Sequence, residues 1–178
     1  VLKAQGEREK HPTASLAKVM NIIVALDEID KGNASLDDEV CFTPDTAYLK
    51  GSWLNVKHGD CFTLETLLKS EIIYSANNAA YLVAKYIGKG DIEKFVALMN
   101  EKAQELGMTD TVFYTPAGLP TSMTGKPMDI STAYDLYLMG RKASEDDRIK
   151  EWSSQLQLEL PNPNGDQVIY KNRNALLY

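Results

Sequence analysis

The chain is poor in the residues that hold metals or carry thiol and imidazole chemistry, with 2 cysteines and 2 histidines in 178 residues. Cys41 and Cys61 show no metal-ligand spacing, and His11 and His58 form no His-x-x-x-His pair. We therefore expect no zinc or other metal site and no cofactor. Nothing in the sequence marks either thiol as catalytic.

Long apolar runs are also absent. A membrane-spanning helix needs roughly 18 or more apolar residues, and the run from Ile22 to Leu26 is far too short. The chain starts abruptly at Val1, without Met, a basic segment or the apolar core of a signal peptide, and it ends on the apolar stretch 175–178. These abrupt ends indicate a fragment of a longer precursor, truncated at both ends. Missing signals therefore say nothing about export.

Positive charge is not in excess. The formal net charge is −6, and the lysines are scattered among acidic residues rather than clustered as phosphate neutralisation requires. No nucleic-acid partner is expected. The hydrophobic fraction of 44% and the charged fraction of 25% are ordinary for a soluble globular protein. The length suits one domain, residues 1–178, rather than two.

The hydrophobic pattern predicts helices with short strands between them. Val1-Leu2 could end a strand, and from Ala14 to Ile29 apolar residues recur at helical spacing on one face, starting with Leu16. Further helices are predicted at 63–73 (with Thr63 as the N-cap), 79–87, 91–106 (with Asp91 as the N-cap) and 129–140 (begun by Ser131 or Asp129). Strands are predicted within 34–63 and at 112–114, 155–160 and 168–170. Because helices and strands segregate rather than alternate, we expect an α+β fold.

Cys41 and Cys61 lie in near-identical contexts, Val-Cys-Phe-Thr and Asp-Cys-Phe-Thr, which both have the character of short strands. If these strands pair antiparallel, the two thiols could form a disulfide in an oxidising compartment. The alternative, which the sequence favours somewhat, is that the two cysteines are separate small core residues.

A Ser-x-x-Lys pattern opens the first predicted helix, as Ser15 and Lys18. Residues three apart lie on the same face of a helix, one turn from each other. A serine hydroxyl is a poor nucleophile until a neighbour takes its proton, and a lysine amine kept neutral by burial can do this. A helix N-terminus adds positive potential where negative charge develops. Alone, the pattern is better explained by an N-cap serine and a solvated lysine.

A second pattern, Ser75-Ala76-Asn77, lies between two predicted helices. Such a turn can aim a hydroxyl and a carboxamide into a cleft, although helix capping by either side chain explains the same residues. In this order the two patterns are far more specific together than apart. Ser-x-x-Lys, Ser-Asp-Asn and Lys-Thr-Gly mark penicillin-binding proteins and class A β-lactamases.

Over almost its whole length the chain resembles the low-molecular-mass serine D-alanyl-D-alanine carboxypeptidases, which are penicillin-binding proteins. Residues 12–20, Pro-Thr-Ala-Ser-Leu-Ala-Lys-Val-Met, look like the nucleophile segment of that family. The other segments that are similar to family motifs are 67–70, 74–80, 113–120, 131–136 and 172–177. The resemblance implies a helical cluster against an antiparallel sheet, in a single domain that is incomplete at both termini.

The resemblance also implies a chemistry. Ser15 would attack the carbonyl between the two D-alanines of a peptidoglycan stem peptide, with Lys18 as the general base. Ser75 would relay protons, Asn77 would hold the substrate amide, and the backbone N–H of Ser15 would form part of the oxyanion hole. β-Lactam antibiotics would acylate the same serine as substrate mimics. The location would be extracytoplasmic, with the parent protein associated with the membrane through a C-terminal segment.

One family motif, Lys-Thr-Gly, is absent from this chain, and in the family it begins shortly beyond the position of Tyr178. Its strand supplies the lysine that meets the substrate carboxylate and a second oxyanion donor. Losing one such donor costs roughly 3 kcal/mol, which is about a hundredfold or more in rate. We therefore expect little or no hydrolysis by this chain unless another chain supplies the strand. Normal turnover of a diacetyl-Lys-D-Ala-D-Ala peptide would contradict this.

Three other functions are weaker readings of the same sequence. A class A β-lactamase needs a glutamate in a loop after the second motif to activate water, and the glutamates found there, at 93, 101 and 105, fall on a predicted helix. A non-catalytic cell-wall-binding module of the same fold need not retain both motifs intact. A Ser-His-Asp hydrolase is disfavoured because Gly-x-Ser-x-Gly does not occur.

Overall fold

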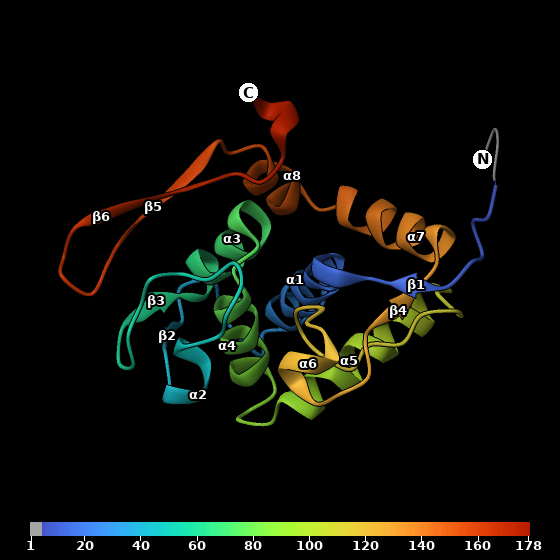
Figure 1. Cartoon of the computed structure of the whole chain (residues 1–178), viewed down its shortest axis with the longest axis horizontal. Helices are drawn as coiled ribbons and strands as arrows, with labels where there is room; N and C mark the ends of the chain where they lie inside the picture. Colours follow the sequence, from blue (N-terminus) through green and yellow to red (C-terminus); the bar gives the residue numbers. More distant parts are fainter. Residues whose placement is uncertain (1–4) are drawn as a thin grey trace.

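The computed structural model describes residues 5–178, so the strand end expected at Val1-Leu2 lies outside the described residues. The helices gather around a central helix, α1 (Ala17–Asp30), and the short strands lie further out (Figure 1). This is the α+β architecture that the sequence predicts. The remaining helices are α2 (Pro44–Ala47), α3 (Leu64–Tyr74), α4 (Asn77–Ile87), α5 (Ile92–Glu105), α6 (Thr121–Thr124), α7 (Ala133–Ser144) and α8 (Asp147–Ser153).

The antiparallel pairing is divided among three two-stranded sheets. The expected C-terminal hairpin forms, with Gln157 opposite Lys171 at its base. The strand expected at 112–114 is reduced to a single bridge between Val112 and Ile130. The sheets pair β1 (His11–Pro12) with β4 (Ile130–Ser131), β2 (Glu39–Cys41) with β3 (Cys61–Thr63), and β5 (Gln157–Pro161) with β6 (Gln167–Lys171).

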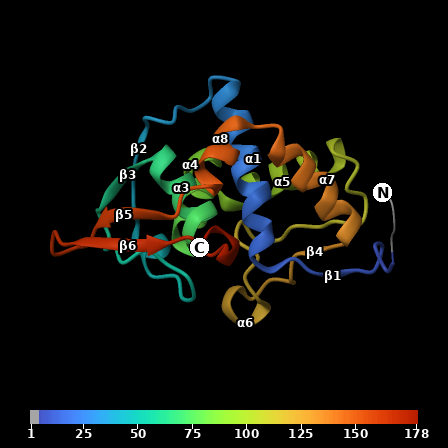
Figure 2. The ribbon, with the colours of Figure 1, turned by 90° about the horizontal axis from the view of Figure 1, so that it is seen from above.

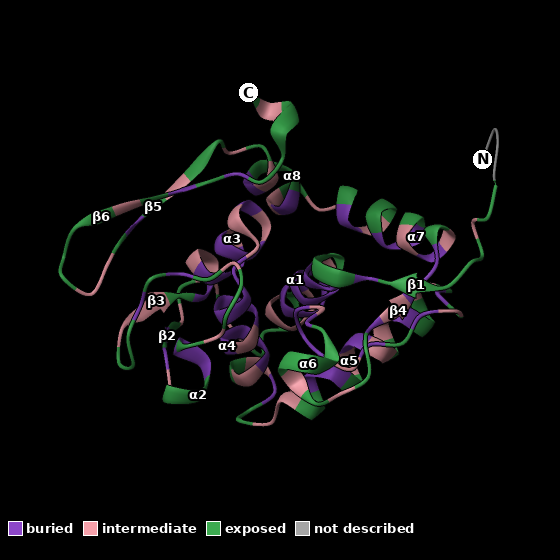
Figure 3. Ribbon diagram, viewed as in Figure 1, coloured by how far each residue is buried: buried purple, intermediate pink, exposed green. Residues whose placement is uncertain are grey.

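Helix α1 forms the centre of the core. The sequence predicts one apolar face, but every residue from 20 to 26 is buried, because α3, α4, α5 and α7 all pack against this helix (Figure 2). Leu16, which the pattern counts with the apolar face, lies in a 3-10 turn ahead of α1 and is exposed. In Figure 3, the purple colour of α1 marks its buried residues. Such a helix holds the residues at its N-terminus in a fixed position.

Two predicted helix starts are confirmed and one is wrong. The Thr63 side chain accepts from the N–H of Thr66, and Asp91 caps α5 in the same way. The helix expected at 129–140 instead begins at Ala133 with Thr132 as its N-cap. Ile130 pairs in an extended conformation, and the carboxylate of Asp129 accepts hydrogen bonds from the preceding loop rather than from a helix end. Helices α2, α6 and α8 were not predicted. Among the described residues, no helix has the length and apolarity to cross a bilayer.

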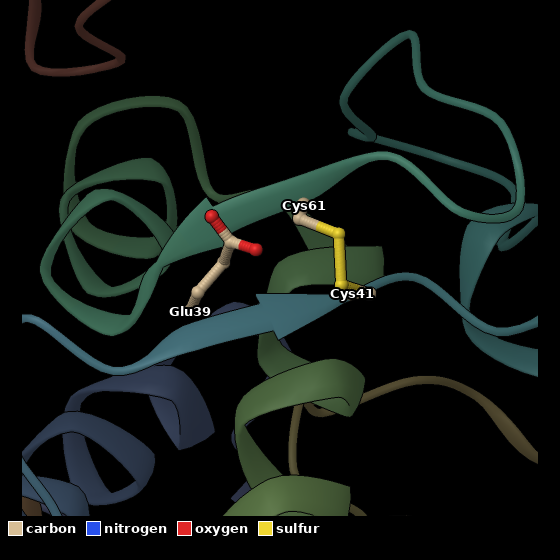
Figure 4. Close-up of side chains that lie close together, drawn as sticks. All are labelled: Glu39, Cys41 and Cys61. Atoms are coloured by element: carbon tan, nitrogen blue, oxygen red, sulfur yellow. A yellow bond between two sulfur atoms is a disulfide. The ribbon is translucent and has the colours of Figure 1, made fainter.

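Cys41 and Cys61 lie directly opposite each other on β2 and β3 and form a disulfide (Figure 4). The reading of two separate core residues is therefore wrong, and the antiparallel pairing of their strands is the reason. Glu39 lies beside the two sulfur atoms, and these three residues are the one cluster of potential metal ligands in residues 5–178. Both sulfurs are bonded to each other, so they offer no thiolate to a metal.

Reducing the Cys41–Cys61 disulfide is expected to destabilise the protein by about 2–4 kcal/mol, because the closed loop of 20 residues regains its freedom in the unfolded chain. Urea unfolding with and without a reductant measures this difference. A Cys41→Ala/Cys61→Ala variant should match the reduced protein and should no longer respond to the reductant. Equal unfolding midpoints for the oxidised and reduced forms would contradict the prediction.

Candidate active site

Ser15 and Lys18 meet at the start of α1. Ser15 lies in the 3-10 turn Ala14–Leu16 and is exposed, whereas Lys18, one turn later, is only 2% exposed. The Lys18 Nζ atom lies 3.1 Å from the Ser15 Oγ atom, within hydrogen-bond distance. The predicted pair is therefore an accessible hydroxyl above a buried amine, and the alternative of a solvated lysine is wrong.

Burial changes the acid–base behaviour of Lys18. Loss of solvation lowers the pKa of its amine to about 8, and the nearby carboxyl of Glu71 opposes that shift. An amine with a pKa near 8 has a substantial neutral fraction near neutral pH, which an ordinary lysine does not have. The neutral form has a free lone pair for the proton of Ser15.

The turn at Pro116–Gly118 closes over this pair. Lys18 Nζ donates to the carbonyl oxygen of Ala117 at 3.1 Å. Gly118 has a φ of +73°, and a Cβ atom placed there would lie 1.7 Å from the carbonyl oxygen of Ala14. Ala14 itself has a positive φ of 46°. The two turns therefore touch backbone to backbone, and the contact fixes the position of Ser15.

Asn21, one turn beyond Lys18, ties the same segments together. It is fully buried, and its Nδ2 atom donates to the carbonyl oxygens of Ala80 on α4 and of Pro116 at 3.0 and 3.1 Å. The loop ahead of that turn is held by the buried carboxylate of Asp129, which accepts from the backbone N–H groups of Tyr114 and Thr115. Helix α1, helix α4 and the 116–118 turn are thus connected by buried polar contacts.

Ser75 and Asn77 form the break between α3 and α4. Ser75 adopts a left-handed conformation, with φ 63°, and its N–H closes α3 onto the carbonyl oxygen of Glu71. Its hydroxyl makes no hydrogen bond within residues 5–178. Asn77 is buried, and its Nδ2 atom donates to the carbonyl oxygen of Lys50 at 2.8 Å. The Asn77 amide is thus positioned by the loop ahead of Ser52, and not by Ser15 or Lys18.

The sequence patterns find part of this site. The structure joins Ser15 and Lys18 by a hydrogen bond, and it brings α3 and α4, which flank Ser75 and Asn77, against α1. No hydrogen bond links the two motifs directly within the described residues. Sequence reasoning missed three contributors: the Ala117 carbonyl, Asn21 and Glu71. A backbone acceptor cannot be recognised from its residue type. Two polar side chains could have been noticed: Asn21 interrupts the apolar run 19–26, and Glu71 continues the helical spacing of the apolar residues 64, 67 and 68.

A groove lies beside the 116–118 turn. It is lined mainly by apolar and aromatic side chains of α4, α5, α6 and the loops around them, namely Leu49, Tyr81, Tyr114, Pro116, Leu119 and Met123. Lys126 and Glu93 form an ion pair at its polar side. The groove adjoins the turn that supplies the Ala117 carbonyl to Lys18, although Ser15 and Lys18 do not line it.

Comparisons with known proteins agree on one family. The family described as D-alanyl-D-alanine carboxypeptidase matches residues 1–178. The chain is 33% identical to D-alanyl-D-alanine carboxypeptidase DacB2 of Mycobacterium tuberculosis over 99% of this chain and 57% of that protein. The chain spans about half the length of the named relatives that it matches.

Solved structures give the same result. Penicillin-binding protein 6B from Escherichia coli is 30% identical and superposes with a TM-score of 0.86, covering 99% of this chain and 55% of that one. Penicillin-binding protein D2 from Listeria monocytogenes, solved in its ampicillin-bound form, is 26% identical with a TM-score of 0.79, covering 99% of this chain and 68% of that one. The likeness covers both motif segments and the 116–118 turn.

Proposed function

This chain belongs to the D-alanyl-D-alanine carboxypeptidase family, and from that premise we propose that the protein removes the terminal D-alanine of peptidoglycan stem peptides through an acyl-enzyme on Ser15. One observation carries the proposal: the Lys18 Nζ atom lies 3.1 Å from Ser15 Oγ in an environment that lowers the pKa of the amine to about 8. A base must lie within hydrogen-bond reach of the proton it takes, and this amine does.

In the proposed acylation, Ser15 Oγ attacks the carbonyl carbon between the two D-alanines while its proton moves to neutral Lys18 Nζ. The Ala117 carbonyl holds the amine in place for this transfer. Negative charge develops on the substrate oxygen, and the Ser15 backbone N–H can donate to it. Collapse of the tetrahedral intermediate breaks the C–N bond, and Lys18 returns its proton to the departing D-alanine amine. Water then hydrolyses the ester.

Ser75 and Asn77 have supporting roles in this proposal. The free hydroxyl of Ser75 relays protons between Lys18 and the leaving group. One N–H of the Asn77 amide is held by the carbonyl of Lys50. The other N–H and the amide oxygen of Asn77 bind the peptide. Penicillin and related β-lactams acylate Ser15 as mimics of the substrate. A relative of this chain was solved with ampicillin bound, which supports that part of the proposal.

The proposed location is outside the cytoplasm, where peptidoglycan is found. The Cys41–Cys61 disulfide supports this location, because disulfides form and persist in oxidising compartments. We further propose that the protein is exported, contributes to cell-wall maturation and cell shape, and is held at the membrane by a segment of the parent protein.

The test is covalent labelling of this chain with a fluorescent penicillin, followed by peptide mapping by mass spectrometry. We expect a single adduct, on the peptide that contains Ser15. No adduct on a folded chain would contradict the proposal and favour a non-catalytic wall-binding module. An adduct that forms and is released within seconds, with rapid hydrolysis of the β-lactam, would favour a β-lactamase instead. Because this sequence contains no Lys-Thr-Gly, the expected label accumulates slowly and turnover of D-Ala-D-Ala peptides is low.

A further inference from the structure

The chain between the two cysteines reaches the second motif. Strand β2 ends at Cys41 and strand β3 begins at Cys61, so the disulfide closes residues 42–60, here called the disulfide loop, at its base (Figure 4). Within the described residues 42–60, the four-residue helix α2 is the only regular element. The loop is anchored to the core by the buried side chains at 42, 46, 47, 54 and 56. Its shape therefore depends on contacts with the elements around it.

The disulfide loop holds Asn77 through both its backbone and its side chain. The backbone N–H of Asn77 donates to the carbonyl oxygen of Ser52 at 2.7 Å, and its Nδ2 atom donates to the carbonyl oxygen of Lys50 at 2.8 Å. Gly51, between these two acceptors, has a φ of +96°, and a Cβ atom there would lie 2.7 Å from Asn77 Nδ2. The orientation of the Asn77 amide is therefore set by residues 50–52.

The next residue of α4 fastens the same loop. Asn78 is fully buried, its Oδ1 atom accepts from the N–H of Leu54 at 2.9 Å, and its Nδ2 atom donates to the carbonyl oxygen of Leu54 at 3.0 Å. Further along α4, Lys85 pairs with Asp45 of the loop at 2.7 Å. Helix α4 and the disulfide loop are thus joined at several points, so a displacement of the loop is transmitted to Asn77.

We propose, on the basis of the proposed acyl transfer, that the Cys41–Cys61 disulfide is a positioning element of this site, so that acylation of Ser15 depends on its oxidation state. The intact disulfide fixes both ends of the loop that holds Asn77. In the reduced chain, the ends are held by the pairing of two three-residue strands, and the loop gains conformational freedom. Asn77 then loses its fixed orientation toward the peptide, and misplacing a group that orients the substrate slows the reaction.

The disulfide is accessible to a reductant. Cys41 is exposed and lines an open groove of about 430 Å³, together with Leu82 and Lys85 of α4. A thiolate of a dithiol attacks the Cys41 sulfur, and Cys61 leaves as a thiolate that takes up a proton. The second thiol then displaces Cys41, which is protonated in turn, and the reductant becomes a cyclic disulfide. Two electrons and two protons pass to the chain, and a disulfide oxidant such as oxidised glutathione reverses the exchange.

The first test compares penicillin acylation of the oxidised, the dithiothreitol-reduced and the reoxidised chain, each folded and freed of reagent. We expect reduction to lower the rate at sub-saturating penicillin about tenfold, and reoxidation to restore it. The loss should appear as a higher half-saturating penicillin concentration, because Asn77 binds the amide whereas Lys18 takes the proton. An unchanged rate after complete reduction, or a loss confined to the maximal rate, would overturn the proposal.

A core variant separates lost positioning from lost stability. Met139 on α7 is 2% exposed, and α7 packs against α1 and α8. Met139→Ala leaves a cavity and lowers the stability of the protein, as reduction does, but keeps the disulfide loop closed. Its half-saturating penicillin concentration should equal that of wild type. A rise as large as the one caused by reduction would mean that any loss of stability weakens binding, and would count against the positioning role.

A pair of glycine variants tests the same contact with the disulfide intact. Gly51→Ala places a Cβ atom against Asn77 Nδ2 and displaces the amide, so the half-saturating concentration should rise as it does on reduction. Gly59 lies in the same loop with a φ of +90°, and a Cβ atom there meets nothing within 4 Å. Gly59→Ala should therefore bind penicillin like wild type. Equal values for the two variants would refute the positioning of Asn77 by the loop, even if the reduced chain did not fold.

Hydrogen exchange of backbone N–H groups, followed by mass spectrometry, does not need acylation. Reduction should speed exchange at Asn77 and Leu54, whose N–H groups bond between the loop and α4, relative to the buried residues 20–26 of α1. Faster exchange at both positions, together with no acylation of the oxidised chain, would reject the proposed function alone. Unchanged exchange at both positions would reject the positioning role of the disulfide.

Discussion

Replacing Lys18 by methionine is expected to lower the rate of Ser15 acylation by a benzylpenicillin probe by about 10²–10⁴-fold at pH 8, without unfolding the protein. The amine at 3.1 Å is the base in reach of the hydroxyl, and general base catalysis is worth a factor of this size. Methionine fills a similar volume, and burial raises the pKa of the neighbouring Glu71 carboxyl, which favours its neutral form once the Lys18 charge is gone, so the stability should not fall with the rate. Stopped-flow or timed mass spectrometry of the adduct measures the rate.

Two further variants are the controls for that measurement. Ser15→Ala gives the zero-rate reference, because no oxygen remains to be acylated. Lys94→Met removes a lysine whose side chain is 72% exposed on α5, and its rate should equal that of wild type. A Lys18→Met rate within about threefold of wild type would mean that another group takes the Ser15 proton, and the proposed mechanism would then be wrong.

The Ser15–Lys18 pair was predictable because its spacing is local: residues three apart meet on one turn, whatever the rest of the chain does. The surroundings that make Lys18 a base could not be predicted, because the Ala117 carbonyl belongs to a loop 99 residues away in the sequence. Burial of α1 on all sides follows from packing by four other helices, which a single-helix periodicity cannot reveal. Site residues supplied by tertiary contacts are therefore the ones that the sequence patterns miss.

The same distinction holds for the fold. The caps at Thr63 and Asp91 and the C-terminal hairpin depend on neighbouring residues, and they were predicted correctly. The disulfide depends on the register of two strands, which places Cys41 opposite Cys61, and the preference for separate thiols was wrong. The wrongly predicted helix start at Asp129 has a similar cause. The Asp129 carboxylate accepts hydrogen bonds from Tyr114 and Thr115, which come close to it only in the folded protein.

Replacing Gly118 by alanine is expected to destabilise the protein by about 3 kcal/mol or more and to reduce Ser15 acylation more than tenfold. Alanine at a φ of +73° is strained by about 1–2 kcal/mol. The new Cβ would also lie 1.7 Å from the Ala14 carbonyl oxygen, which is backbone and cannot rotate away. Relieving that overlap adds about 1–3 kcal/mol. It also pushes the Ala117 carbonyl off Lys18, so the base loses its orientation. Urea unfolding and penicillin acylation measure the two effects.

Gly125→Ala is the matched control that separates the two causes. Gly125 ends α6 with a φ of +71°, nearly the value at Gly118, but a Cβ atom there meets nothing within 4 Å. Its replacement should cost only the backbone strain, about 1–2 kcal/mol, and leave acylation unchanged. The difference between the variants isolates the contact between the 116–118 turn and the nucleophile turn. If Gly118→Ala and Gly125→Ala lose the same stability and acylate at the same rate, the contact between the two turns does not hold Ser15. The left-handed backbone conformation alone would then explain why residue 118 is a glycine.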